Sequence, residues 1–299
     1  MISYFDLHCD TLREAYINGY SLDSSPLHIS LEKARNFKKY IQVTAIWSDC
    51  ELNDHDAYLN YRKILNYAKN QGISFASSFT DLNDHPFILA IEDARIIEND
   101  LSRIEEFYKN GVRFMTLNWA NESIIGGAWN TNTSLSELGE KAVLKCFEVG
   151  IIPDISHSSR ETVQKVFSLA EANNKKIVAT HSNSFSVCNH QRNLTDEEFL
   201  FFVKTSSIVG ISMCPSHISN NPATIYDILR HIDHYLMLGG ENTVCFGCDF
   251  DGISSLPEGI SDISDMEKVY YSVLKSFGEK ISNKIFFENA FNFMRKNLN

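Results

Sequence analysis

The chain has 299 residues, of which 43% are hydrophobic and 22% charged, an ordinary composition for a globular protein that buries a core without disulfides. Its formal net charge of −11 and the lack of a basic stripe exclude a typical nucleic-acid-binding surface. No apolar stretch approaches the roughly 20 residues of a membrane span, and neither a signal peptide nor a lipid-anchor tail is recognisable. The lack of a membrane span favours a protein without membrane partners. The seven cysteines are odd in number, and Cys245 and Cys248 are too isolated from other thiols to form a zinc cage, so we expect reduced thiols in a cytoplasmic protein.

Short apolar runs alternate with longer amphipathic stretches along the chain. The short runs predict strands at 3–10, 40–47, 86–93, 112–118, 151–156, 176–181, 208–214 and 243–249. The amphipathic stretches predict helices that include 56–71, 137–150, 223–238, 265–277 and 279–297. Thr195 followed by Glu198 predicts a capping box at the start of another helix. Eight such units in fewer than 300 residues predict an α/β fold, a (β/α)8 TIM barrel, in one domain over 1–299 with the C-terminal helices packed against it.

Residues of metal-ligand type fall at the ends of the predicted strands rather than at their starts. They are His8, Asp10, Glu92, His157, His181 and Asp249. In (β/α)8 barrels, the carboxyl-terminal ends of the strands carry the active site. The positions of these residues therefore predict a catalytic site at that rim.

His8 and Asp10 form an HxD pattern at the end of the first strand. Residues two apart in a strand point to the same side, so both side chains can reach one metal ion. The alternative for an isolated HxD is a polar strand end with a capped histidine. Asp6 shares this parity but lies deeper, and we expect it to be structural.

Glu92 follows a run of five apolar residues in FILAIEDA. A carboxylate is costly to bury there unless it is paired or binds a cation, and a role as a bridge between two metal ions resolves that cost. The alternative is an exposed glutamate just beyond the strand. Asp93 faces the other way by strand alternation and is the weaker candidate.

His157 and His181 each follow a buried strand, in PDISHSS and VATHSNS. Each offers a neutral imidazole, the commonest nitrogen ligand of zinc. A single histidine here is as often a hydrogen-bonded structural residue, but two on consecutive strand ends favour metal binding.

Asp249 ends the eighth predicted strand, in the segment DFDG. A carboxylate there can accept a proton from a metal-activated water and return it to a leaving amine. The alternative is an aspartate that forms a turn before Gly252. Asp251 is farther from the strand end, and we expect it to shape the loop.

Arg192 lies in the polar loop NHQRNLTDE after the sixth predicted strand. Arginine is suited to bidentate capture of a carboxylate. The alternative is a surface arginine paired with Asp196 or Glu197.

Together these segments resemble the membrane (renal) dipeptidase family, the zinc-dependent peptidase family M19. The resemblance covers nearly the whole chain. Its most specific segments are THSNSFSVCNHQRNLTDE (180–197), HIDHYLMLGGENTVCFGCDFDGI (231–253) and LPEGISDIS (256–264), with support from 154–159 and 111–119.

The resemblance implies a barrel of the metal-dependent amidohydrolase type with two Zn²⁺ ions. One ion would be held by His8 and Asp10 and the other by His157 and His181, with Glu92 and a water or hydroxide as bridges. Asp249 would be the acid/base residue, and Arg192 would bind the substrate carboxylate. The family hydrolyses dipeptides, including some with a D-residue at the carboxyl end.

The sequence departs from the animal members of the family at one substrate contact. Trp119 stands where the animal enzymes have a histidine that contacts substrate, and many bacterial relatives also carry Trp there. Trp119 is therefore a candidate substrate-binding residue. A GLTPFG-like stretch is replaced by TSLSELG (133–139). The sequence shows no anchor or secretion signal like those of the animal enzymes, which favours a bacterial cytosolic type. The sequence does not decide between a monomer and a homodimer.

Two alternatives to a dipeptidase stay open at this point. One is another binuclear metal hydrolase on the same fold, such as a lactonase, cyclic amidase or deaminase. The other is a catalytically silent metal-binding relative. Arg192 counts against the first, because it provides for a substrate carboxylate. Asp249 counts against the second, because a silent protein needs no proton shuttle.

Overall fold

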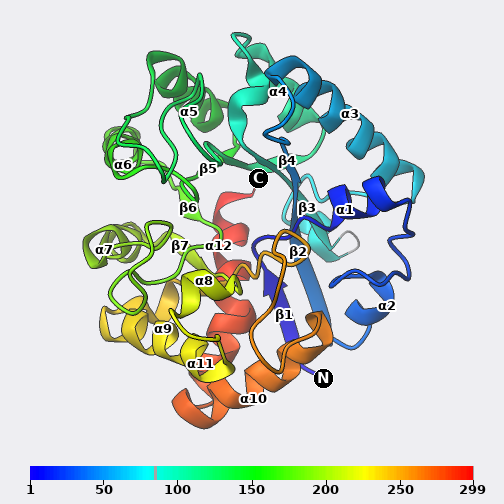
Figure 1. Cartoon of the computed structure of the whole chain (residues 1–299), viewed down its shortest axis with the longest axis vertical. Coiled ribbons are helices and arrows are strands. Elements are labelled where there is room, and N and C mark those ends of the chain that lie inside the picture. The colour runs from blue at the N-terminus through cyan, green and yellow to red at the C-terminus, as the bar shows by residue number, and fades with distance from the viewer. Residues whose placement is uncertain (84–85, 299) are drawn as a thin grey trace. The chain divides into compact units, whose positions relative to one another are not determined.

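The computed structural model describes residues 1–83 and 86–298, in which eight parallel strands follow one another in chain order in a closed barrel. Helices separate consecutive strands along the chain (Figure 1). The strands are β1 (Ser3–Asp6), β2 (Lys39–Trp47), β3 (Phe87–Glu92), β4 (Val112–Thr116), β5 (Ile152–Asp154), β6 (Val178–Ala179), β7 (Ile208–Ile211) and β8 (Val244–Phe246). Each overlaps a predicted strand, and the predicted (β/α)8 barrel is confirmed.

Helices are present at the predicted ranges 56–71, 137–150, 223–238 and 265–277. The α-helices are α1 (Thr11–Asn18), α2 (Leu31–Ala34), α3 (Asp54–Asn70), α4 (Ser102–Lys109), α5 (Glu137–Val149), α6 (Arg160–Asn173), α7 (Asp196–Thr205), α8 (Pro215–Ile218), α9 (Ile225–Met237), α10 (Met266–Phe277), α11 (Glu279–Asn283) and α12 (Asn289–Asn297). Short 3-10 turns are η1 (Thr80–Asn83), η2 (Ala94–Ile97), η3 (Gly240–Asn242) and η4 (Ile263–Asp265), and η5 (Lys284–Glu288) is a π-helical turn. The capping box of Thr195 and Glu198 is confirmed at the start of α7.

The chain divides into two compact units, which are described separately. The first unit comprises residues 1–44 and 180–296, and the second comprises residues 45–179 and the chain from 297 on. The single domain over 1–299 stays a prediction.

In the first unit, β1 pairs in parallel with β2 and with β8, and β7 pairs with β8. The π-helical turn η5 packs its aromatic side chains against this sheet. The Phe286 ring lies 4.7 Å from that of Phe246 and 5.8 Å from that of Tyr4, measured between centroids. All three side chains are fully buried, so they form an aromatic core behind the strands.

In the second unit, β3 pairs with β4, β4 with β5 and β5 with β6, all in parallel. Helices α3 and α4 contribute Tyr61 and Phe107, whose rings make an edge-to-face contact at 5.1 Å between centroids. Helix α5 begins at its N-cap Ser136, whose side chain accepts the Gly139 N–H, and ends at Gly150 in the left-handed conformation. These local signals explain why the sequence located α5 closely.

Several strands are shorter than predicted, so most candidate ligands lie in the loops after the strands and not within them. Strand β1 ends at Asp6, so His8 and Asp10 follow it instead of ending it, because the His8 N–H donates to the Asp6 side chain (2.9 Å). His181 and Asp249 likewise lie beyond β6 and β8. Glu92 is the last residue of β3, as predicted.

All seven cysteines, which lie within the described residues, are free thiols. Five are buried as small apolar side chains, as expected, whereas Cys214 is partly exposed and Cys50 is exposed. Burial raises the pKa of Cys9 to about 12. Among the helices of residues 1–83 and 86–298, none combines the length and apolar character of a membrane span.

Candidate metal centre and active site

The first unit gathers three side chains of metal-ligand type. One ligand atom from each of His8, His181 and Asp249 lies within 4.8 Å of the others. The His8 Nε2 atom is 3.5 Å from Asp10 Oδ2 and 3.8 Å from Asp249 Oδ1, and the His8 and His181 rings are 3.9 Å apart. All four residues are buried. Imidazole nitrogens and carboxylate oxygens at such spacing form a donor set that suits zinc.

Thr180 sets the orientation of both imidazoles. Its hydroxyl lies 2.9 Å from His181 Nδ1 and 3.5 Å from His8 Nδ1. The Nε2 atom of His8 is the one that faces the carboxylates. A hydrogen bond to one ring nitrogen typically fixes the tautomer and direction of a metal-binding histidine, so Thr180 prepares these rings for binding.

Asp6, the last residue of β1, holds the backbone next to this cluster through hydrogen bonds. Its fully buried carboxylate accepts hydrogen bonds from the His8 N–H (2.9 Å), the Cys248 N–H (3.1 Å) and the Tyr4 hydroxyl (2.5 Å). It therefore ties together the chain that leaves β1 and the chain that leaves β8, in the structural role expected of it.

The loop after β8 leaves no space beside Asp10 and Asp249. A Cβ atom built on Gly252 would lie 2.2 Å from Asp10 Oδ2 and 2.6 Å from Asp249 Oδ1, far inside van der Waals contact. Asp249 itself has a positive φ of 65°, and its carbonyl accepts the Gly252 N–H at 3.1 Å. The turn predicted as an alternative role for Asp249 is thus present together with the ligand-type carboxylate.

Asp251 joins the same loop to the start of α1 and to the segment after α1. Its carboxylate accepts the Thr11 hydroxyl and the His28 N–H, both at 2.6 Å, and its own N–H donates to His28 Nδ1 at 2.9 Å. Asp251 shapes the loop, as the sequence indicated.

Arg192 is buried, with an exposed fraction of only 5%, and so is not the surface residue considered as the alternative. Asp196, its suggested partner in that alternative, instead contacts His234 at 2.7 Å. Burial is the main cause of the raised pKa of Cys214, which Asp249 raises further and Arg192 lowers. Both charges therefore act on one thiol of the first unit.

The second unit holds Glu92 and His157 together. His157 Nε2 is 3.0 Å from Glu92 Oε1, and Glu92 is 3% exposed, which excludes the exposed glutamate beyond the strand. The His157 Nδ1 atom lies 2.9 Å from the Trp119 carbonyl oxygen. His157 also has a positive φ of 68°, a conformation that costs free energy in a non-glycine residue and that often marks functional sites.

Two tryptophans adjoin this pair. The Trp119 ring stacks on that of His157 at 6.0 Å between centroids, and the Trp47 ring lies 4.7 Å from that of Trp119. Trp119, predicted to bind substrate, is therefore next to a candidate ligand. Trp47 was missed because it ends a predicted strand as an ordinary apolar residue.

A second feature that the sequence did not reveal surrounds Arg95. This buried arginine pairs with Asp93, the residue after Glu92, at 3.2 Å between Nε and Oδ2. The only signal in the sequence is the D-x-R spacing, which by itself is too common to be informative.

Comparisons with known proteins identify the family of the chain. The family model described as membrane dipeptidase, peptidase family M19, matches residues 1–298. An uncharacterized dipeptidase of Schizosaccharomyces pombe is 26% identical over 288 residues, which cover 85% of this chain and 69% of that protein.

Solved structures share the fold of this chain. A metallopeptidase described as dipeptidase AC, of family M19, superimposes with a TM-score of 0.89 at 22% identity, over 99% of both chains. A metallopeptidase from Rhodobacter sphaeroides, bound to a phosphinate mimic of L-Ala-D-Ala, gives a TM-score of 0.87 at 22% identity, again over 99% of both chains. The chain therefore belongs to the membrane dipeptidase family, peptidase family M19, and is a metal-dependent dipeptidase.

Proposed function

We propose that the protein is a binuclear zinc dipeptidase. His8 and Asp10 would hold one ion and His157 and His181 the other, with Glu92 as the bridging carboxylate. The observation that carries this proposal is that each unit gathers imidazole and carboxylate donors in its interior. His8, Asp10, His181 and Glu92 are buried, and His157 is partly buried with its Nε2 atom 3.0 Å from Glu92 Oε1. Buried carboxylates of this kind are stable only when paired or bound to a cation.

Two bound ions would lower the pKa of a water and polarise the peptide carbonyl. Asp249 would accept the proton of that water and deliver it to the departing amine. Its carboxylate lies 3.8 Å from His8 Nε2, within reach of a water near the ligands. The buried Arg192 would bind the carboxylate of the C-terminal residue, which restricts the enzyme to short substrates.

The substrates would be dipeptides, including those with a D-residue at the carboxyl end. The structural neighbour from Rhodobacter sphaeroides binds a mimic of L-Ala-D-Ala, which supports this stereochemistry. Trp119 would contact the substrate, because its ring lies against the candidate ligand His157.

One experiment separates the dipeptidase from its alternatives. The purified protein is analysed for metal content and assayed on a panel of L,L- and L,D-dipeptides, lactones, cyclic amides and aminated heterocycles. We expect two zinc ions per chain and turnover of dipeptides, with D-residues accepted only at the carboxyl end. Turnover confined to lactones, cyclic amides or deamination substrates would replace the proposed reaction. One ion or none, with no gain on adding zinc, would refute the binuclear site.

The protein would act in the cytoplasm on small peptides, without nucleic-acid or membrane partners. A homodimer is the assembly to test, by light scattering during gel filtration. A molecular mass of 34.0 kDa in solution would show a monomer instead.

A further inference from the structure

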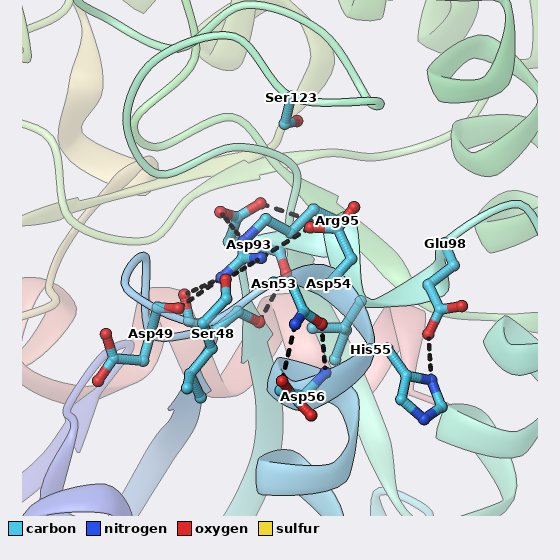
Figure 2. A network of polar contacts seen from close by, with 12 residues as sticks. Ser48, Asp49, Asn53, Asp54, His55, Asp56, Asp93, Arg95, Glu98 and Ser123 are labelled. Atoms are coloured by element: carbon cyan, nitrogen blue, oxygen red, sulfur yellow. Dashed lines mark hydrogen bonds and ion pairs between the residues drawn. The ribbon is translucent and has the colours of Figure 1, made fainter.

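Arg95 lies on η2, directly after β3, and is 8% exposed. Dashed lines in Figure 2 run from its guanidinium group to Asp93 and to the segment that joins β2 to α3. Its contacts are Asp93 Oδ2 (3.2 Å), Asp54 Oδ1 (2.7 Å) and the carbonyl oxygens of Leu52 (3.0 Å), Ser48 (3.2 Å) and Asp49 (2.5 Å). One buried cation thus binds both the end of β3 and the segment 48–54.

Asp93 is held in a conformation that an L-residue rarely adopts, with φ 73° and ψ 99°. Three contacts oppose its relaxation. Its side chain accepts the Arg95 N–H (3.3 Å) in addition to the ion pair, and its carbonyl accepts the Ser48 hydroxyl (2.9 Å). The Ser48 N–H donates to the Glu92 carbonyl (2.9 Å). Ser48 therefore holds the carbonyl groups of both peptide groups that flank the Asp93 Cα atom.

We propose that Arg95 is a positioning residue that directs the Glu92 carboxylate toward the metal ions, and this rests on the proposed role of Glu92 as a ligand. Without the guanidinium group, Asp93 loses its charge partner, and the segment 48–54 loses its donor to three carbonyls. The strained backbone at Asp93 can then relax, and Glu92, the preceding residue, turns with it. Arg95 touches no reacting atom, so it acts through Glu92 alone.

The test measures zinc affinity by chelator competition, independently of turnover. Replacement of residues that orient metal ligands typically weakens metal binding about 10–100-fold, which is the loss expected for Arg95→Met. Arg95→Lys should fall between Arg95→Met and the wild type, because one ammonium can pair with Asp93 or Asp54 but cannot span the three carbonyls. The visible absorption of bound Co²⁺ should change in both variants.

Arg113→Met is the matched control. Arg113 belongs to the same unit, is 3% exposed and also donates to backbone carbonyls, those of Ser77, Tyr108 and Val112. It lies near the start of β4, whereas Glu92 is the last residue of β3. Its replacement should lower the unfolding temperature while zinc affinity and the Co²⁺ spectrum stay as in the wild type.

The outcomes separate the two proposals. A wild type that binds no zinc refutes the metal site itself. A wild type that binds zinc, with Arg95→Met and Arg113→Met equal in zinc affinity, overturns the role of Arg95. If Arg95→Met does not fold, Arg95→Lys decides, because a wild-type affinity and Co²⁺ spectrum in that variant also overturn it.

Discussion

The two units hold their candidate ligands by different means. In the first, neutral hydrogen bonds from Thr180 and close packing against Gly252 fix His8 and Asp249. In the second, Glu92 is followed by a strained residue that an ion pair with Arg95 holds in place. We therefore expect the ligands of the first unit to be displaced by an added side-chain atom, and Glu92 in the second unit to be displaced by removal of the Arg95 charge.

Loss of one metal ligand should reduce zinc content and dipeptidase activity more than any other change below, and by the same amount whichever unit the ligand belongs to. His8→Ala and His157→Ala should each retain at most one zinc ion and lose most dipeptidase activity. Both should remain folded, because residues at the rim of a barrel serve chemistry more than stability. Elemental analysis, a dipeptide assay and circular dichroism check this. A variant that keeps two ions removes its residue from the ligand set.

Asp249→Asn should separate proton transfer from metal binding within the first unit. The amide keeps the shape but accepts no proton, so kcat should fall by about 10²–10⁴-fold while both ions remain. Metal content and kcat are measured on the same preparation. Because Asp249 shares a cluster with His8 and His181, loss of an ion would instead identify it as a ligand.

Gly252→Ala should reveal the tight packing of the first unit. The added methyl group must displace Asp10 or Asp249, and a displacement near 1 Å costs about 10² in rate. Gly259→Ala is the control in the same loop. Nothing lies within 4 Å of its Cβ, but its φ is +86°, so it should lower stability and leave kcat unchanged. Equal activity of the two variants would show that the clash is relieved elsewhere.

Arg192→Ala should give the smallest of these effects and test substrate capture. A charge-assisted hydrogen bond contributes about 1.5–3 kcal/mol, so kcat/KM for a free dipeptide should fall at least about tenfold. The same dipeptide amidated at its carboxyl end should be a poor substrate of the wild type and lose little more in the variant. If the wild type cleaves acid and amide equally, Arg192 does not bind the substrate carboxylate.

The sequence was most informative where one residue type had few stable roles. Glu92 after an apolar run and His181 after a buried strand are costly to bury without a partner, and the structure buries both, whereas His157 is partly buried. The alternation of apolar runs with amphipathic stretches likewise predicted each strand, because parallel strands are buried on both faces.

Positions that depend on backbone conformation could not be predicted in this way. Strand alternation placed Asp93 away from the site, but its positive φ ends the alternation and turns it toward Arg95. The clearance at Gly252 depends on atoms that lie far away in the sequence, on Asp10. The end of β1 was misplaced for the same reason, since the His8 N–H donates to the Asp6 side chain and not to a neighbouring strand.

The distribution of thiols makes the second unit accessible to spectroscopy. Cys50 is exposed and lies within the segment 48–54, whose carbonyls on either side of it bind Arg95. Burial raises the pKa of Cys9, Cys146, Cys245 and Cys248, so these thiols are poor nucleophiles. With the partly exposed Cys214 replaced by serine, a maleimide dye would react mainly at Cys50. Its fluorescence anisotropy would then report motion of this segment in native protein.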